Sequence, residues 1–159
     1  MKSAHLTGRR NYFEDFTAGL VIRHARGKTV GETENVLLTH LVMNSADAHF
    51  NEDKMRRTPF GRRLSYGGVN LSLVFGLAAQ DTAEQAVVEL GMEQIRFRAP
   101  VFHGDTLYAY TEVLAVRDAD RPDCGEVHFR HYGVNQFGQL VCEGERRALL
   151  KRRAHWGDR

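Results

Sequence analysis

The spacing of apolar residues changes along the chain, from a helical period in the first half to the period of two that is typical of β-strands. Apolar residues recur at helical spacing behind Thr33, which predicts a helix over residues 34–46 with Thr33 as its N-cap. Residues 67–80 are apolar nearly all around a helical wheel. A helix of that kind must be buried on most of its sides.

The second half of the chain predicts four strands, over residues 86–98, 106–117, 126–135 and 139–152. Short turns separate these strands, and short turns favour antiparallel neighbours. The apolar face of such a sheet needs cover, and the helix over residues 67–80 is the only predicted element of sufficient length. We therefore expect an α+β fold, in which an antiparallel sheet is wrapped around one central helix.

The segments before the central helix carry weaker patterns. Two β-like pieces, at residues 21–22 and 28–30, predict an extended segment with a turn at Arg26 and Gly27. Residues 48–66 contain turn-forming residues and no sustained period, which indicates a long ordered loop with a helical turn near residues 52–57.

Length and composition indicate one globular domain over residues 1–159, with residues 1–15 and 153–159 at its periphery. Apolar residues make up 42% and charged residues 26%, as in ordinary water-soluble proteins. Apolar runs stay well short of the roughly 20 residues that a membrane-spanning helix needs, so we expect no membrane association. The N-terminus lacks a secretory signal pattern. Cys124 and Cys142 lack metal-ligand spacing, which indicates free thiols in the cytoplasm and no metal or redox cofactor.

Charge adds one candidate binding feature. The net charge of +2 is too small to indicate a nucleic-acid partner, and we expect none. Basic residues nevertheless form two clusters, one at Arg56, Arg57, Arg62 and Arg63, and one at Arg146, Arg147, Lys151, Arg152 and Arg153. Clusters of this kind are usually solvated surface, and some of them bind an anionic ligand.

Polar and titratable residues gather between the two predicted helices, at Asn44, Asp47 and His49. One interpretation is helix-end chemistry, because Asn and Asp favour caps and turns. The other is a histidine beside an amide or a carboxylate, able to position and activate water. The residue types alone leave both interpretations open.

Gly67 and Gly68, which open the central helix, also have two interpretations. They can serve only to let the backbone turn or a neighbour pack closely. They can also expose the free N–H groups of a helix N-terminus to an oxyanion, in a field strengthened by Arg62 and Arg63.

Two segments carry a resemblance to a known family. The run from His49 to Gly67, HFNEDKMRRTPFGRRLSYG, resembles the hydratase signature of the MaoC-like dehydratases, the (R)-specific enoyl-CoA hydratases of the hotdog fold. Residues 97–107, FRAPVFHGDTL, are similar to a second motif of that family. The resemblance extends from Tyr12 to Lys151 and implies a hotdog fold, an acyl-CoA thioester as substrate and no other cofactor.

The resemblance also assigns roles to individual positions. His49 matches the catalytic histidine, whereas Asn44 stands at the position of the catalytic aspartate and Tyr66 at that of a histidine before the oxyanion glycine. Three hypotheses follow. Asn44 orients the water while neutral His49 takes its proton; Asp47 replaces the missing carboxylate; or the site is inactive and only binds acyl thioesters. We favour the first, because the amide oxygen can still accept a hydrogen bond from water.

The activity implied is addition of water to the double bond of a 2-enoyl-CoA, with the N–H of Gly67 or Gly68 holding the thioester oxygen. Residues 48–51, AHFN, resemble a mesaconyl-CoA hydratase-like subset that acts on branched or dicarboxylic C4–C5 acyl-CoA. The second carboxylate of such a substrate, or the phosphates of CoA, would bind arginines such as Arg62 and Arg63. The alternatives are a hotdog thioesterase and an inactive acyl-thioester-binding protein.

An oligomer is also expected. One open sheet around one helix leaves an edge strand exposed, and hotdog domains usually pair edge to edge. We therefore expect a homodimer or a higher homo-oligomer, with active sites near the subunit interface.

Overall fold

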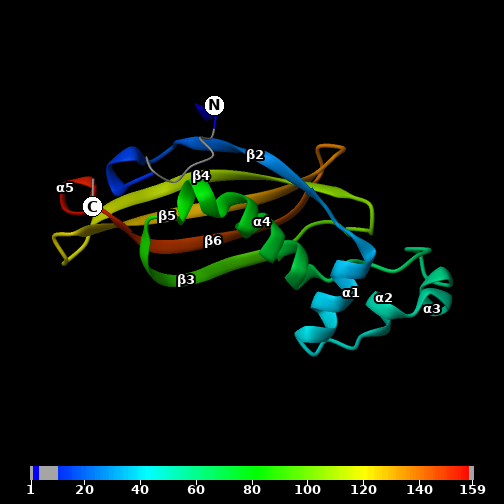
Figure 1. The fold of residues 1–159 in the computed structure, drawn as a ribbon. Helices are drawn as coiled ribbons and strands as arrows, with labels where there is room; N and C mark the ends of the chain where they lie inside the picture. The colour runs from blue at the N-terminus through cyan, green and yellow to red at the C-terminus, as the bar shows by residue number, and fades with distance from the viewer. Residues whose placement is uncertain (1, 4–10, 158–159) are drawn as a thin grey trace.

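The computed structural model describes residues 2–3 and 11–157, which form one curved sheet around a central helix (Figure 1). The strands are β1 (Lys2–Ser3), β2 (Val21–Thr29), β3 (Ala86–Phe97), β4 (Thr106–Asp118), β5 (Cys124–Asn135) and β6 (Leu140–Lys151). The helices are η2 (Phe13–Asp15), α1 (Glu32–Leu41), α2 (Asp47–Phe50), α3 (Glu52–Arg56), α4 (Gly67–Thr82) and α5 (Arg153–Trp156). The strand order β1-β2-β4-β5-β6-β3 leaves β3 at one edge. The four predicted strands and the central helix are confirmed.

The strand pairs β2–β4, β4–β5, β5–β6 and β6–β3 are antiparallel, whereas β1 pairs with β2 in parallel. The predicted turn at Arg26 and Gly27 is wrong, because β2 runs on as one strand with a register shift between Arg23 and Gly27. Gly27 has a different reason to be glycine. A Cβ atom there would lie 2.5 Å from the Tyr108 ring of the neighbouring strand, so the ring occupies the space of a side chain.

Helix α1 starts and ends earlier than predicted. Its N-cap is Gly31 rather than Thr33, and the backbone N–H of Gly31 donates to Glu34 Oε1 at 3.2 Å. It ends at Leu41, and the φ angle of 62° at Met43 turns the backbone out of the helix. The apolar residues that predict this helix lie on its exposed side, whereas its fully buried residues are polar: Asn35 and Thr39.

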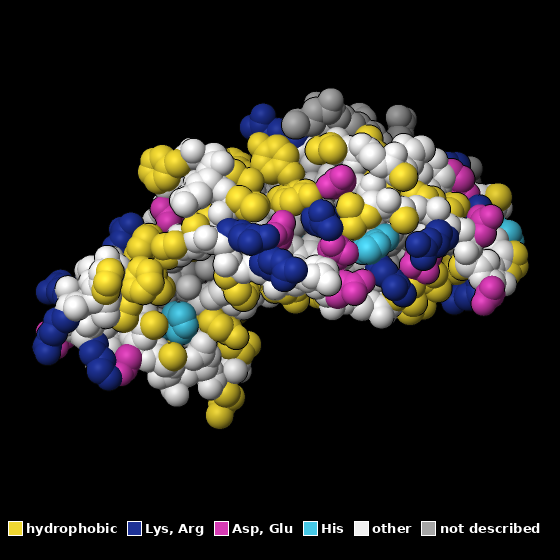
Figure 2. All heavy atoms as spheres, turned by 180° about the vertical axis from the view of Figure 1, so that it is seen from behind, with side chains coloured by type: hydrophobic (Ala, Val, Ile, Leu, Met, Phe, Trp, Pro, Cys, Tyr) yellow, Lys and Arg dark blue, Asp and Glu magenta, His cyan; other side chains and the backbone are white. Residues whose placement is uncertain are grey.

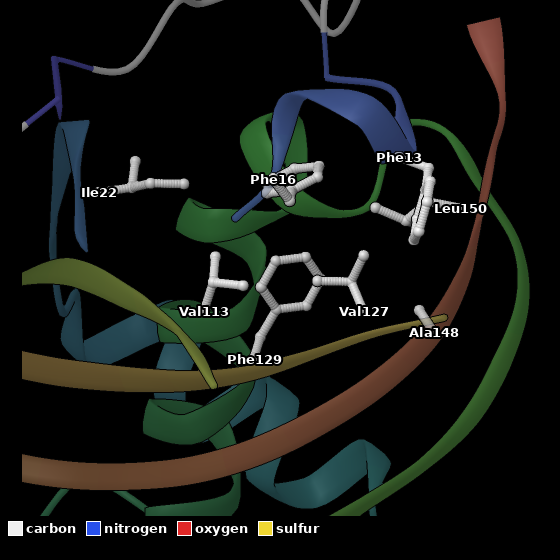
Figure 3. Close-up of a cluster of buried hydrophobic side chains, with 8 residues drawn as sticks. All are labelled: Phe13, Phe16, Ile22, Val113, Val127, Phe129, Ala148 and Leu150. Carbon is white, nitrogen blue, oxygen red and sulfur yellow. The ribbon is translucent and has the colours of Figure 1, made fainter. Parts of the chain in front are cut away.

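The core lies between α4 and the sheet. Val74 and Ala78 of α4 are fully buried, as the all-round apolar pattern predicts. A second buried cluster lies between the sheet and the N-terminal segment (Figure 3). In it, the rings of Phe16 and Phe129 meet edge to face, with their centres 5.2 Å apart. The cluster comprises Phe13, Phe16, Ile22, Val113, Val127, Phe129, Ala148 and Leu150.

The expected peripheral position of residues 1–15 is wrong for residues 11–15, because Tyr12 and Phe13 are buried against the sheet. Residues 1 and 4–10 lie outside the described residues. At the other end, residues 153–156 form a short exposed helix. Within the described residues, no helix is long and apolar enough to cross a membrane.

Candidate functional site

A cavity of about 560 Å³ opens at the N-terminus of α4, on the side of the segment that holds α2 and α3. Four of the residues singled out from the sequence line this cavity together: His49, Tyr66, Gly67 and Gly68. The opposite wall comes from the end of β3 and the segment after it, and includes Phe97. In Figure 1 this region lies where α4 approaches α1–α3. The cavity therefore joins the two parts of the sequence that carry the family resemblance.

His49 is held by the backbone of the loop that leads into α4. Its Nδ1 lies 2.9 Å from the carbonyl oxygen of Leu64, and Nδ1–H is the donor because a carbonyl can only accept. The backbone N–H of Leu64 donates in return to the carbonyl of Ala48 at 2.9 Å. These two bonds tie helix α2 to the loop. In a neutral His49 ring, the Nδ1–H bond to Leu64 leaves the lone pair on Nε2, so Nε2 is the atom that can take a proton.

The start of α4 offers backbone donors to the same cavity. The first N–H groups of any helix have no partner within the helix. Tyr66 is the N-cap of α4, and its side chain accepts no hydrogen bond from them. A Cβ atom at Gly67 would lie 2.9 Å from the Phe97 ring, and one at Gly68 would lie 2.6 Å from the Tyr66 ring. Both glycines therefore let aromatic rings lie against the first turn.

A buried polar network fixes this first turn. Asn35 Oδ1 accepts hydrogen bonds from the Ser65 hydroxyl at 2.9 Å and from the Tyr66 backbone N–H at 3.2 Å. Its amide nitrogen donates to His103 Nε2 at 2.9 Å. Burial, and then the charge of Arg63, lower the pKa of His103, which favours the neutral acceptor. This network could not be predicted from the sequence, because a polar residue within an apolar helical pattern gives no sign of its long-range partners.

Asn44 and Asp47 do not line the cavity. Asn44 Oδ1 accepts a hydrogen bond from the backbone N–H of Ala46 at 3.0 Å, which is the turn chemistry of the first interpretation. Asp47 is exposed and pairs with Lys54, and the hydrogen bond from Lys54 lowers the pKa of the Asp47 carboxyl. The catalytic roles considered for these two residues stay predictions.

The two arginines expected to meet an anion have other partners. The Arg62 guanidinium lies 4.0 Å above the centre of the Phe102 ring. Arg63 pairs with Glu32 and, at 3.0 Å, with Glu52, and both carboxylates raise its pKa. Neither arginine lines the cavity.

Arg98 lines the cavity instead, and it is half-exposed. Its Nε donates to Glu143 Oε1 at 2.9 Å. Arg98 is not among the site residues predicted from the sequence, although it lies within the second motif, directly after Phe97.

A separate charged region lies on the face of the sheet shown in Figure 2, where side chains of both signs alternate around a histidine. Glu93, His128 and Glu145 lie close enough to share a metal ion, with their ligand atoms within 4.8 Å of one another. Glu145, however, already accepts a hydrogen bond from Arg130 at 3.1 Å and lies 2.8 Å from His128 Nε2. The Glu145 carboxylate is therefore already engaged by Arg130 and by the His128 ring.

Comparison with known proteins identifies the relatives of this chain. The sequence profile of the family described as "Mesaconyl-CoA hydratase" matches residues 4–152. A mesaconyl-CoA hydratase from Haloarcula marismortui is 35% identical over 152 residues, which cover 89% of this chain and 42% of that protein. A beta-methylmalyl-CoA dehydratase from Chloroflexus aurantiacus is 36% identical over 161 residues, covering 90% of this chain and 45% of that protein.

The fold has the same relatives. The crystal structure of a putative MaoC domain protein dehydratase from Chloroflexus aurantiacus superposes with a TM-score of 0.83 at 29% identity, over 91% of this chain and 45% of that one. This likeness and the strand order confirm the hotdog fold. The chain spans less than half the length of the two curated relatives. It belongs to the mesaconyl-CoA hydratase family, within the MaoC-like hotdog proteins.

Proposed function

We propose that this chain is an enoyl-CoA hydratase, a hydro-lyase that adds water to the double bond of a 2-enoyl-CoA or removes it in reverse. One observation carries the proposal. The Leu64 carbonyl engages His49 Nδ1, which leaves Nε2 as the proton acceptor in a cavity that also contains the N-terminus of α4.

The reaction follows from these groups. Water loses a proton to His49 Nε2 as its oxygen bonds to the β-carbon, and the electrons of the double bond move toward the thioester oxygen. The N–H groups of Gly67 or Gly68 stabilise the resulting enolate, which is the species that catalysis must favour. His49 then returns the proton to the α-carbon. The reaction balances, because water adds across the double bond and His49 returns the proton that it took up.

Asn44 keeps the water-orienting role in this proposal. Asn44 does not line the cavity and its Oδ1 accepts a hydrogen bond from Ala46, so the role requires its side chain to turn into the cavity and to exchange that bond for one from the reacting water. Ala46 is an exposed residue, so water can take the place of Asn44 as the acceptor for its N–H.

For the substrate we propose a branched or dicarboxylic C4–C5 acyl-CoA, of the kind named for the two curated relatives. The cation that meets its second carboxylate is then Arg98, because it lines the cavity and Arg62 and Arg63 do not; to do so it shares or leaves its ion pair with Glu143. Replacing Arg98 with Gln is expected to lower kcat/KM for mesaconyl-CoA while sparing crotonyl-CoA, which lacks the carboxylate. An equal loss on both substrates would refute the role of Arg98.

The experiment that tests the reaction offers purified protein a panel of straight, branched and dicarboxylic 2-enoyl-CoAs and measures hydration and free thiol in parallel. A hydratase forms the hydroxyacyl-CoA without releasing thiol. Thiol release without hydration would instead identify a thioesterase, and tight binding without turnover an inactive acyl-thioester-binding protein.

We also propose a homodimer formed through β3. This edge strand pairs only with β6 among the described strands, and it exposes five apolar side chains: Val88, Leu90, Met92, Ile95 and Phe97. Phe97 is 57% exposed and also lines the cavity, so a partner at this edge would lie beside the active site. Light scattering on wild type and Met92→Lys tests the proposal. A dimer that the charged substitution dissociates is expected, and a monomeric wild type would contradict it.

A further inference from the structure

A second hollow lies beside α4, on the other side of Tyr66 from the His49 cavity. This groove measures about 390 Å³. Its apolar wall comes from α1, its C-cap and α4, with Leu38, Val42, Val69 and Leu73, and none of the described residues that line it is charged. A lining of this composition suits a hydrocarbon chain rather than a carboxylate.

Among the described residues, Tyr66 and Gly68 alone line both hollows. The Tyr66 ring is 5.4 Å from the His49 ring, centre to centre. On its other side it covers Gly68 so closely that a Cβ atom there would lie 2.9 Å from the tyrosine hydroxyl. The tyrosine ring is therefore the side chain that separates the His49 cavity from the groove.

The groove also lies away from the expected subunit interface. Its floor continues along α4 into a hollow lined by Arg26, Gly27 and Lys28 of β2. In the strand order, β2 lies toward one end of the sheet and β3 at the other end, with β4, β5 and β6 between them. The groove therefore extends toward the β2 end of the sheet, whereas the proposed subunit interface lies at the β3 end.

We propose that Tyr66 limits the length of the acyl group by closing the His49 cavity, and that the groove behind it receives a longer straight acyl chain once this ring is removed. The proposal rests on the proposed hydratase function, since it assumes that an acyl thioester occupies the His49 cavity. It assigns the preference for short acyl groups to one side chain.

The test compares straight-chain 2-enoyl-CoAs of four and ten acyl carbons on wild type and Tyr66→Ala, with Tyr66→Leu as a second variant that keeps an apolar side chain at the helix start. The ratio of kcat/KM for the ten-carbon to the four-carbon substrate is expected to rise about tenfold at the least, because burial of only one of the additional methylenes in an apolar site already contributes about that factor. An unchanged ratio in a folded variant would overturn the proposal.

A filled groove supplies the matched control. Leu38 is 41% exposed on α1, so Leu38→Trp can fill the groove with little effect on the core. Alone it should leave the wild-type ratio unchanged, and in the Tyr66→Ala background it should abolish the gain. A gain that survives Leu38→Trp would show that the longer chain goes elsewhere and would overturn the proposal.

Binding of saturated acyl-CoAs separates this proposal from the proposed function. Decanoyl-CoA and butyryl-CoA cannot be hydrated, so calorimetry reports their affinities even if wild type hydrates no enoyl-CoA at all. Tyr66→Ala is expected to raise the affinity for decanoyl-CoA relative to butyryl-CoA about tenfold or more. Equal relative affinities in wild type and variant would refute the role of Tyr66, whatever the outcome for hydration.

Discussion

A chain of buried hydrogen bonds crosses the core far from the His49 cavity, and its last member makes stability depend on pH. His24 lies between Asp81, at 2.6 Å, and the hydroxyl of Thr111, at 2.7 Å. The same hydroxyl lies 2.7 Å from His131 Nδ1. His131 is fully buried, and its Nε2 has no hydrogen-bond partner among the described residues. A second proton on this ring would therefore be buried without an acceptor.

The magnitude follows from the pKa of His131. Burial, with smaller effects of Arg146 and His24, lowers that pKa from 6.5 to about 3. Between these values the unfolded chain binds a proton that the folded chain does not, so the free energy of unfolding rises with pH. Between about pH 7.5 and about pH 5, the two pKa values correspond to a loss of about 2 kcal/mol from this one residue.

The assay is urea unfolding of wild type and His131→Phe at both pH values. Phenylalanine keeps an aromatic ring against Phe75, whose centre lies 4.6 Å from that of His131, and it cannot bind a proton. The variant is expected to lose about 2 kcal/mol less than wild type on acidification. His155→Gln, at an exposed position, is the matched control and should follow wild type.

Equal losses in wild type and His131→Phe would refute the reasoning. Such a result would mean that His131 gains a partner or solvent when it is protonated, so that burial does not control its pKa. A larger loss in the variant would contradict the sign as well.

Three further predictions concern the core and the site. Gly76→Ala should stabilise the protein by about 1 kcal/mol in thermal unfolding, because nothing lies within 4 Å of the Cβ atom that alanine adds. Gly67→Ala should not give that stabilisation and should lower kcat/KM, because its added Cβ atom displaces the Phe97 ring. Equal gains at both glycines would contradict this difference. Phe129→Ala should cost about 3–5 kcal/mol in urea unfolding, because its ring is fully buried, and a cost below about 1 kcal/mol would contradict that packing. Asn44→Asp should retain hydration with an added acidic limb in the pH–rate profile, since a carboxylate must ionise, and complete loss would exclude Asn44 from the water-binding role.

Local patterns were sufficient to predict the elements whose environment is uniform. Helix α4 is apolar nearly all round because the sheet surrounds most of it, so its own sequence is sufficient to predict a buried helix. The strands β4 and β5 alternate between buried and partly exposed residues because one face of each meets the core. The cavity itself could be expected only through the motif that contains His49 and Gly67.

Long-range contacts account for what the sequence could not predict. Gly27 indicated a turn, but it makes room for Tyr108, about eighty residues later in the chain. Asp47 stands beside His49 in sequence, yet Lys54 engages it on the exposed side of α2. Arg98 lines the cavity because β3 ends there, and this position becomes visible only when the sheet is assembled.

Hydration of mesaconyl-CoA or crotonyl-CoA by wild type and His49→Ala tests the central claim most directly, with the hydroxyacyl-CoA product and free thiol measured in the same samples. Wild type is expected to hydrate at least one of the two substrates without thiol release. His49→Ala should reduce kcat on the order of a hundredfold or more while retaining the wild-type melting behaviour. Undiminished hydration by His49→Ala, or thiol release as the only reaction of wild type, would contradict the account.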